Sequence, residues 1–283
     1  SEHSAIAQCL ASGVHERGLT AQRVTGKSEL AQLVLTASGG PFRGKKRADL
    51  AEVTPQQALA HPTWNMGPVV TINSSTLVNK GLELIEAHLL FDVPASDIVP
   101  VVHPQSIIHS MVTWKDGATI AQASPPDMKL PIALGLTWPK RLPDIEKPVD
   151  FLQRQEWTFE PVDSQTFPAI NLARAAVSES PTHPAVYNAA NEVFVDAFLR
   201  GQLAYLSIVD LLEEVLAEHQ GIDEPTLDDI LGAQEWAKAS ARSHIMCEER
   251  KRIFVGIIGV LVIVVGLLIS VALHECGSMI AAK

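Results

Sequence analysis

SIIHSMVTWKDGATIAQAS, residues 106–124, is the stretch that decides the fold. Its two halves are rich in strand-forming residues, and Lys115, Asp116 and Gly117 separate them. Asp-Gly between two such runs is a strong signal for a tight turn. We therefore predict a β-hairpin that turns at Asp116 and Gly117 and supplies two strands of a sheet.

The surrounding residues, 1–137, alternate strand-like runs with helical patterns. The other strand-like runs are AQLVLTAS (31–38), GPVVTINS (67–74) and IVPVVHPQ (98–105). Helical segments between short strands favour an α+β domain in which helices pack on a mixed sheet. We predict such a domain over residues 1–137.

Downstream of this domain the sequence predicts a connector and then a helical bundle. Residues 138–168 are interrupted by Pro139, Pro143, Pro148, Pro161 and Pro168, which is typical of a connector. Residues 169–245 then repeat apolar residues at helical spacing. The expected faces are Val186, Ala189, Ala190, Val193 and Ala197 in one helix, and Ile208, Leu211, Leu212 and Val215 in the next, after an N-cap at Ser207. Thr226 and Asp229 have the spacing of a capping box for a third helix.

The last segment, residues 246–283, contains an uncharged apolar run from Ile253 to Leu273. A bilayer core about 30 Å thick needs about 20 such residues in a helix. We predict a transmembrane helix over 253–273, and the basic residues 250–252 would keep the N-terminal part in the cytoplasm. The alternative is a buried core helix.

Composition limits the classes of function. The formal charge of −10 and the pI near 5.4 leave no basic surface for nucleic acid, so we expect no nucleic-acid partner. The three cysteines, Cys9, Cys247 and Cys276, are scattered and odd in number. This agrees with a reducing cytoplasm rather than a disulfide framework.

The segment SSTLVNKGLELIEA, residues 74–87, holds the most informative polar residues. Hydroxyls at 74–76 stand before an apolar helical run and would cap the helix. Asn79, Lys80 and Glu83 then fall on one side of the helix. Together they form a plausible phosphate cradle, with a carboxylate that could hold a divalent cation beside it. The alternative is a capped surface helix with an ordinary Lys-Glu pair.

Two further loops are candidates for ligand contact. Ser38, Gly39 and Gly40 follow a strand and permit a close approach of the backbone to an anion, although a glycine pair is more often only a turn. In HPTWNMG (61–67), His61 and Trp64 lie on a loop expected between a helix and a strand. Trp64 could close over a small ligand, or simply pack. The chain has no GxGxxG dinucleotide fingerprint.

Taken together, the motifs resemble a known family. SEHSAI (1–6), TASGGPFR (36–43), HPTWNMG, NSSTLVNKGLELIEA (73–87), VVHPQSIIHSMV (101–112), PPDMKLPIA (125–133) and NAANEVFVDAFL (188–199) occur in the order and spacing of 1-deoxy-D-xylulose 5-phosphate reductoisomerase. The resemblance covers residues 1 to about 242. It implies a cytoplasmic enzyme that isomerises 1-deoxy-D-xylulose 5-phosphate and reduces it with NADPH to 2-C-methyl-D-erythritol 4-phosphate, using Mg²⁺ or Mn²⁺, and it implies a possible homodimer.

The resemblance also assigns roles to residues by motif. It makes Glu83, His61 and Lys80 catalytic, Glu2 and Glu83 metal ligands, Trp64 a lid residue and Gly67 an NADPH contact. The residues that it assigns to substrate binding are Ser1, Ser38, His61, Ser74, Asn79, Lys80 and Glu83.

This sequence departs from the family pattern at both ends. The family places an NADPH domain and a third metal carboxylate before the Ser of SEH, so we expect this chain to be a fragment in which residues 1–137 bind substrate and metal. From Met246 onward the sequence resembles the start of a site-2 type intramembrane zinc protease, but Ser278 stands where the motif begun by His274 and Glu275 needs a second His. The alternatives are therefore a membrane-tethered sugar-phosphate-binding module, an inactive protease remnant, or two reading frames joined.

Overall fold

A mixed five-stranded sheet forms the base of the molecule in the computed structural model, which describes residues 1–18, 26–64 and 66–281. The strand order is β4-β3-β1-β2-β5, in which only β1 and β2 run parallel and the other neighbours are antiparallel. The strands are β1 (Leu30–Ala37), β2 (Ile98–Val102), β3 (Ile108–Trp114), β4 (Thr119–Ala123) and β5 (Glu160–Pro161). The α+β class and the mixed sheet are confirmed.

The predicted hairpin is confirmed as β3 and β4. Thr113 pairs with Thr119 across the turn, and Gly117 takes a φ of +92°, a conformation that favours glycine. The side chain of Asp116 accepts a hydrogen bond from the backbone N–H of Ala118 at 2.9 Å. The turn chemistry that the sequence predicted therefore closes this hairpin.

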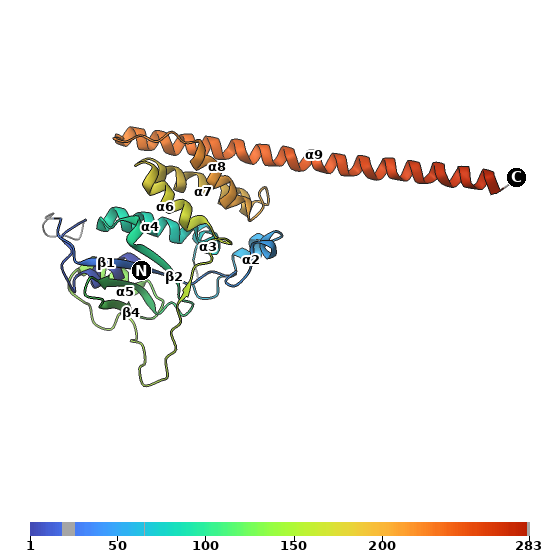
Figure 1. Ribbon diagram of the computed structural model, residues 1–283. Coiled ribbons are helices and arrows are strands. Elements are labelled where there is room, and N and C mark those ends of the chain that lie inside the picture. The colour runs from blue at the N-terminus through green and yellow to red at the C-terminus, as the bar shows by residue number, and fades with distance from the viewer. Residues whose placement is uncertain (19–25, 65, 282–283) are drawn as a thin grey trace.

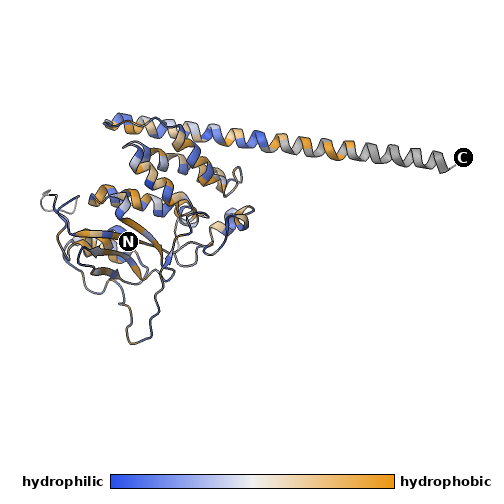
Figure 2. Cartoon of the chain, viewed as in Figure 1, coloured by the Kyte–Doolittle hydropathy of each residue, from blue (hydrophilic) through white to orange (hydrophobic). Residues whose placement is uncertain are grey.

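Helices cover the sheet in successive layers, which Figure 1 shows as α4, then α6 to α8, then α9. Helix α1 packs against β3 and β4, α4 against β2 and α6, and α7 against α8 and α9. The helices are α1 (Glu2–Leu10), α2 (Pro55–Ala58), α3 (Pro68–Ser75), α4 (Val78–Phe91), α5 (Lys129–Thr137), α6 (Ala169–Glu179), α7 (His183–Leu199), α8 (Ser207–Glu218) and α9 (Leu227–Ala281), with short 3₁₀ turns at Arg47–Leu50 and Ala95–Asp97. Figure 2 shows apolar residues recurring along these helices between polar ones, and the buried apolar residues of α4, α6, α7 and α8 belong to one core.

The strand predicted over residues 67–74 is wrong. GPVVTINS forms helix α3, with Gly67 as N-cap and Pro68 in the first turn. Proline is tolerated there because the first helical N–H groups have no partner within the helix. The β-branched run misled the sequence prediction because burial and the helix start outweigh propensity. His61 and Trp64 therefore lie between two helices, α2 and α3, and not between a helix and a strand.

The helix start expected at residues 74–76 is also wrong. Ser74 and Ser75 end α3, Thr76 is its C-cap, and α4 begins only at Val78. Leu77, between the two helices, has a φ of +61°. A left-handed non-glycine residue here turns the chain sharply, so that the end of α3 and the start of α4 face the same space.

The bundle follows the predicted apolar faces. Val186, Ala190 and Ala197 in α7 and Ile208 and Val215 in α8 are buried. Helix α8 starts at Ser207 with Leu206 as N-cap, one residue before the expected cap. Thr226 and Asp229 form the predicted reciprocal hydrogen bonds, at 2.9 Å and 3.2 Å between backbone and side chain. The connector, 138–168, contains only the short strand β5 as regular structure.

Helix α9 runs unbroken through residue 246, where the last segment was expected to begin. Within the part of the chain that the structure describes, no helix is both long and apolar enough to cross a membrane. Most side chains of 253–273, including all beyond Val265, and those of His274, Glu275 and Ser278, lie outside the described residues. The transmembrane helix is therefore not found, and the protease resemblance stays a prediction.

Candidate active site

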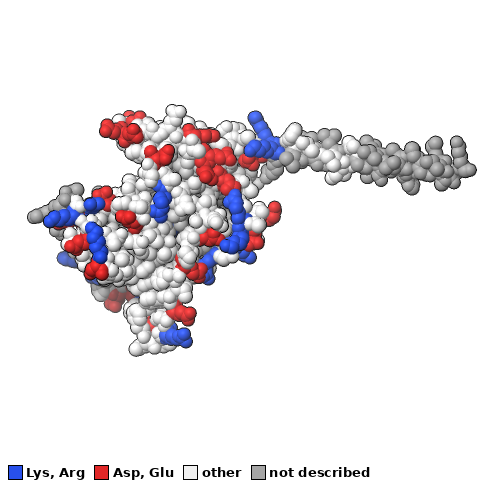
Figure 3. Space-filling model, in the orientation of Figure 1, with Lys and Arg blue, Asp and Glu red and all other residues white. Residues whose placement is uncertain are grey.

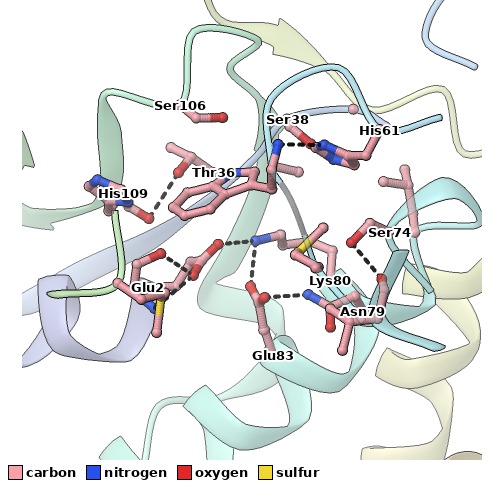
Figure 4. Close-up of a pocket in the computed structure, with 18 of the residues that line it drawn as sticks. Glu2, Thr36, Ser38, His61, Ser74, Asn79, Lys80, Glu83, Ser106 and His109 are labelled. Carbon is pink, nitrogen blue, oxygen red and sulfur yellow. Dashed lines mark hydrogen bonds and ion pairs between the residues drawn. The ribbon is translucent and has the colours of Figure 1, made fainter. Parts of the chain in front are cut away.

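A cavity of about 310 Å³ opens where β1, α1, α3 and α4 meet (Figure 4). It contains nine of the predicted site residues: Ser1, Glu2, Ser38, His61, Trp64, Ser74, Asn79, Lys80 and Glu83. Gly67 is not among its lining residues; it is exposed at the start of α3. The structure therefore brings together residues separated by up to 82 positions in the sequence.

Lys80 is the centre of the polar wall. Its side chain is only 5% exposed, and its Nζ donates to Glu2 Oε1 at 2.9 Å and to Glu83 Oε2. Asn79 Nδ2 donates to the other oxygen of Glu83 at 2.6 Å. Figure 4 shows the two carboxylates converging on this one ammonium from α1 and α4. A buried cation held by two carboxylates is not the surface Lys-Glu pair of the alternative interpretation.

Burial and charge set the protonation of this cluster. Burial raises the pKa of the Glu83 carboxyl to about 7, because desolvation outweighs the attraction of Lys80. Burial also acts to raise the pKa of Glu2, but the Lys80 ammonium outweighs it and holds that pKa well below its usual range. The cluster therefore contains a fixed cation, a firmly ionised carboxylate and a second carboxyl that titrates near neutral pH.

A hydroxyl-lined side of the cavity faces this cluster. Ser38 Oγ lies 3.0 Å from His61 Nε2, and His61 Nδ1 accepts the backbone N–H groups of Thr63 at 3.1 Å and Trp64 at 2.9 Å. Those partners make Nε2 the protonated nitrogen, so His61 donates to Ser38. Burial lowers the pKa of His61 and keeps the ring neutral. Hydroxyl and N–H groups of this kind suit the oxygens of a phosphate.

Two glycines let the Ser38 loop approach α3. A Cβ on Gly40 would lie 2.9 Å from the backbone oxygen of Ser74, and a Cβ on Gly39 would lie 2.8 Å from the Val102 side chain. Both glycines also have positive φ, +87° for Gly39 and +64° for Gly40. The glycine pair predicted to approach an anion therefore also brings Ser38 close to the end of α3, which carries Ser74.

The bundle holds the end of α3 from the other side. Asn191 Nδ2, on α7, donates to Asn73 Oδ1 at 2.9 Å, and the Tyr205 hydroxyl donates to the Ser75 carbonyl at 2.8 Å. Ser74, between these two anchored residues, donates its hydroxyl to the Val70 carbonyl at 2.8 Å. The bundle thus positions a cavity residue although it lines no part of the cavity.

Sequence reasoning missed several cavity residues. The additional lining residues are Thr36, Ala37, Gly39, Met66, Val70, Leu77, Ser106, Ile108, His109 and Met128. Trp64 packs edge-on against His109, with ring centroids 6.4 Å apart, so the aromatic residue expected as a lid contacts one of these. Ser106 and His109 both lie in the VVHPQSIIHSMV motif, residues 101–112, but the motif alone does not indicate a ligand for either side chain.

The donor set fits a hard divalent cation. Mg²⁺ and Mn²⁺ prefer oxygen ligands, and Glu2 and Glu83 each direct a carboxylate oxygen at the Lys80 ammonium, a position that already holds positive charge. Among the described residues, no group of three or more His, Cys, Asp and Glu side chains could hold a metal. Two carboxylates would therefore need further oxygens, such as those of a bound ligand.

Comparison with known proteins supports the same interpretation. Residues 1–91 match the 1-deoxy-D-xylulose 5-phosphate reductoisomerase C-terminal domain, and residues 123–240 match the DXP reductoisomerase C-terminal domain. These two regions belong to the 1-deoxy-D-xylulose 5-phosphate reductoisomerase family. The matched regions end at residue 240, before the apolar run begins.

Individual relatives extend the match. The 1-deoxy-D-xylulose 5-phosphate reductoisomerase of Beutenbergia cavernae is 59% identical over 249 residues, which are 87% of this chain and 60% of the relative. That of Paenarthrobacter aurescens is 57% identical over 239 residues, 84% of this chain and 58% of the relative. The chain therefore spans about 60% of the length of these reductoisomerases.

Solved structures agree with the fold. The Zymomonas mobilis reductoisomerase in complex with NADPH superposes with a TM-score of 0.76 at 38% identity, covering 87% of this chain and 60% of that chain. A DOX-P reductoisomerase in complex with NADPH, fosmidomycin and magnesium gives 0.77 at 34% identity, covering 87% and 62%.

Proposed function

We propose that this chain carries the substrate- and metal-binding part of a 1-deoxy-D-xylulose 5-phosphate reductoisomerase. The reaction would isomerise 1-deoxy-D-xylulose 5-phosphate and reduce the product with NADPH to 2-C-methyl-D-erythritol 4-phosphate. The observation that supports this most is the buried Lys80, held between Glu2 and Glu83 in the same cavity as Ser38, His61 and Ser74. A relative at 59% identity carries the name of this enzyme.

The cavity would receive the phosphate at its hydroxyl-lined side. Ser38, Ser74, Asn79 and Lys80 would hold the phosphate oxygens, because hydroxyl, amide and ammonium groups donate hydrogen bonds to them. His61, neutral and fixed by the backbone of Thr63 and Trp64, would donate through Nε2 beside Ser38. Trp64 would cover the ligand and exclude water, as a lid does.

Glu2 and Glu83 would hold Mg²⁺ or Mn²⁺ beside Lys80. Such a metal supplies Lewis-acid polarisation of the substrate oxygens. Ser1, whose hydroxyl donates to Glu2 at 2.7 Å, would orient that carboxylate and contact the substrate beside it. Lys80 neutralises both carboxylates in this structure and would also attract the phosphate. Glu83, with a pKa raised to about 7, can hold or release a proton near neutral pH.

NADPH supplies the hydride when it is bound. Gly67 is the chain's proposed contact with it, and no atom of the described residues would lie within 4 Å of a Cβ at this exposed position. Open space beside a glycine leaves room for a flat ring to lie against the backbone.

We also propose that two copies of the chain associate, and that residues 1–245 lie in the cytoplasm. Large apolar side chains of α5 and the connector stand exposed, notably Leu136 at 82% and Leu152 at 94%. Exposed apolar side chains that gather on one surface mark a protein contact site. The thiols of Cys9 and Cys247 are free, which agrees with a reducing compartment. Sedimentation of the chain should give twice its 30.6 kDa mass, and Leu152→Asp should give the monomer.

The direct test is NADPH oxidation by the purified chain with 1-deoxy-D-xylulose 5-phosphate and Mn²⁺. Turnover that Lys80→Met abolishes would support the complete activity. Binding of the sugar phosphate without turnover would limit the chain to a binding module, the alternative that the sequence left open. No binding of the sugar phosphate would overturn the proposal.

A further inference from the structure

His103 is a fully buried histidine outside the proposed machinery. It is 0% exposed at the end of β2, and its ring does not line the cavity. Its backbone N–H donates to the Ala37 carbonyl at 2.7 Å, which ties it to the end of β1. The HPQS motif that begins with it, residues 103–106, has no role in the proposed reaction.

Both ring nitrogens of His103 have backbone partners. Nδ1 lies 2.9 Å from the carbonyl oxygen of Thr158, which can only accept. Nε2 accepts two backbone N–H groups, from Ile107 at 3.2 Å and Ile108 at 3.1 Å. These partners require a neutral ring with the proton on Nδ1 and a bare Nε2.

The two N–H groups that Nε2 accepts come directly after Ser106. Ser106 has a φ of +53°, a conformation that non-glycine residues rarely adopt, and its backbone N–H donates to the His103 carbonyl at 3.1 Å. Such a conformation persists only where its surroundings impose it. The hydrogen bonds to Nε2 hold the chain immediately beyond Ser106, so the ring imposes the turn.

Ser106 presents its hydroxyl to the cavity. It lines the cavity and lies at the edge opposite Glu83 in Figure 4. Among the described residues, none forms a hydrogen bond with its Oγ, although the residue is only 8% exposed. A nearly buried hydroxyl without a protein partner is available to a ligand.

The connector holds the outer side of the same ring. Phe159 stacks on His103 with ring centroids 4.6 Å apart and an interplanar angle of 13°. Gln105 Nε2 donates to Thr158 Oγ1 at 3.0 Å, and the Thr158 N–H donates back to Gln105 Oε1 at 3.3 Å. The connector segment 158–159 therefore fastens the turn that carries Ser106.

We propose that His103 is a positioning residue whose Nε2 holds Ser106 in the cavity, where the Ser106 hydroxyl binds the oxygen of an anionic ligand. The proposal for Ser106 rests on the proposed function. The proposal for the ring stands on the contacts of His103 alone. If the proposal holds, the connector affects ligand binding indirectly. Its residues Thr158 and Phe159 hold the His103 ring, and the ring holds Ser106.

Two substitutions separate the roles of the two nitrogens. His103→Gln places an amide oxygen near the position of Nε2 and keeps an acceptor for Ile107 and Ile108. His103→Asn places its amide near Nδ1 and removes that acceptor. We expect fosmidomycin with Mg²⁺, titrated by calorimetry, to bind about tenfold more weakly to His103→Asn and to Ser106→Ala, the effect of losing one hydrogen bond. His103→Gln should stay within about twofold of the unchanged protein.

A double-mutant cycle sharpens the test. If His103 acts through Ser106, His103→Asn combined with Ser106→Ala should bind no more weakly than either single variant. Additive losses, or equal losses in His103→Gln and His103→Asn, would overturn the proposal. His15→Asn is the matched control, because His15 also bonds through both nitrogens, to Ser28 and to the Phe91 carbonyl, away from the cavity. It should leave fosmidomycin binding unchanged.

Two measurements need no ligand and so separate this inference from the proposed function. Amide exchange of Ile107 and Ile108 should accelerate at least about tenfold in His103→Asn and stay slow in His103→Gln. Long-range ¹H–¹⁵N spectra of the unchanged protein should show His103 protonated at Nδ1 only, which holds even if a variant fails to fold. A proton on Nε2 would contradict the inference, whereas absent fosmidomycin binding with these two results intact would contradict only the proposed function.

Discussion

Residues 1–137, the cavity half, and residues 169–245, the bundle half, bury polar groups in different ways. In the cavity half, Lys80 and Glu83 are buried beside open space, and their charges remain available to a ligand. In the bundle half, the Ser180 hydroxyl bonds to Thr182 Oγ1 at 3.1 Å and to His183 Nδ1 at 2.7 Å. Polar groups that bond only to one another within the packing serve the fold, whereas a paired buried charge that also lines a cavity points to a ligand.

The surface charge supports the same contrast. Figure 3 shows acidic side chains gathered over α8 and the adjoining part of α9. They include Asp210, Glu213, Glu214 and Glu218, on the outer face of α8. The cation of the candidate site, Lys80, is instead 5% exposed and contributes nothing to that surface. The positive charge of the proposed site therefore lies inside the molecule.

The largest expected effect is that of Lys80→Met. It leaves two carboxylates buried without their counter-ion, which should cost about 3–5 kcal/mol of unfolding free energy and weaken anionic-ligand binding at least about 100-fold. Urea unfolding and calorimetry measure the two effects. Lys238→Met is the control, since Lys238 pairs with Glu235 on the surface of α9. Equal effects from the two variants would remove the contrast between the halves.

Gly81→Ala should break the contact between the halves. A Cβ on Gly81, in α4, would meet the Tyr187 hydroxyl and would lie 3.0 Å from the Ala173 Cβ in α6. Tyr187 is fully buried and donates to the Ala169 carbonyl at 3.0 Å, so it cannot move away freely. We expect a loss of about 1–3 kcal/mol in unfolding free energy.

Gly232→Ala is the matched control for that change. Gly232 is also inside a helix, but no atom lies within 4 Å of the position that an alanine methyl would occupy there. Helix propensity alone should then stabilise the protein by about 0.5–1 kcal/mol. Equal lowering of the unfolding midpoint by both alanine variants would contradict this account. It would show that the close packing of Gly81 against Tyr187 and Ala173 does not stabilise the contact between the cavity half and the bundle half.

Acidification should lower the stability of the bundle half, because His183 is buried and His219 is partly buried there. Burial lowers the pKa of His183, and burial together with the neighbouring His183 lowers the pKa of His219. The neutral rings are therefore favoured in the fold. Their contribution to stability is present above the ordinary histidine pKa of about 6.5 and is lost as the pH falls below it.

Thermal unfolding between pH 7.5 and 5.5 checks this sign. The Tm should fall by several degrees across that range, and less in His219→Gln, which keeps a side-chain partner for the Thr182 hydroxyl, 2.8 Å from His219 Nε2. A Tm that rises on acidification would show that charged rings are favoured in the fold.

The smallest effect expected is that of Thr226→Ala at the start of α9. It removes the hydroxyl that accepts the Asp229 N–H at 3.2 Å, and the loss of such a cap typically costs about 1 kcal/mol. Chemical denaturation should show the loss without any change in ligand affinity, because the cap is remote from the cavity. A change in affinity would mean that the bundle half controls the cavity more tightly than the contacts of Asn191 and Tyr205 indicate.

The sequence predicted features that depend on neighbours in the chain. The turn at Asp116 and Gly117 and the capping box of Thr226 and Asp229 are local, and both are confirmed. The strand expected over 67–74 was wrong because the start of a helix at Gly67 and Pro68 outweighed the preference of two valines. Propensity is a weak guide where capping and burial oppose it.

The candidate site was predictable only in part. Asn79, Lys80 and Glu83 share one helix, so their spacing alone placed them on one face. Glu2 meets Lys80 across 78 positions, and no periodicity reveals such a contact; only the family resemblance connected them. The role of His103 was hidden for the same reason, because its partner Thr158 lies 55 positions away in the connector.

Calorimetric titration of 1-deoxy-D-xylulose 5-phosphate into the chain, with Mg²⁺ and then with EDTA, tests the central claim most directly. The account predicts one site per chain that binds with Mg²⁺, weakens when the metal is removed and disappears in Lys80→Met. Absence of binding with Mg²⁺, or binding that Lys80→Met leaves unchanged, would contradict the claim that this buried cluster is the site of function.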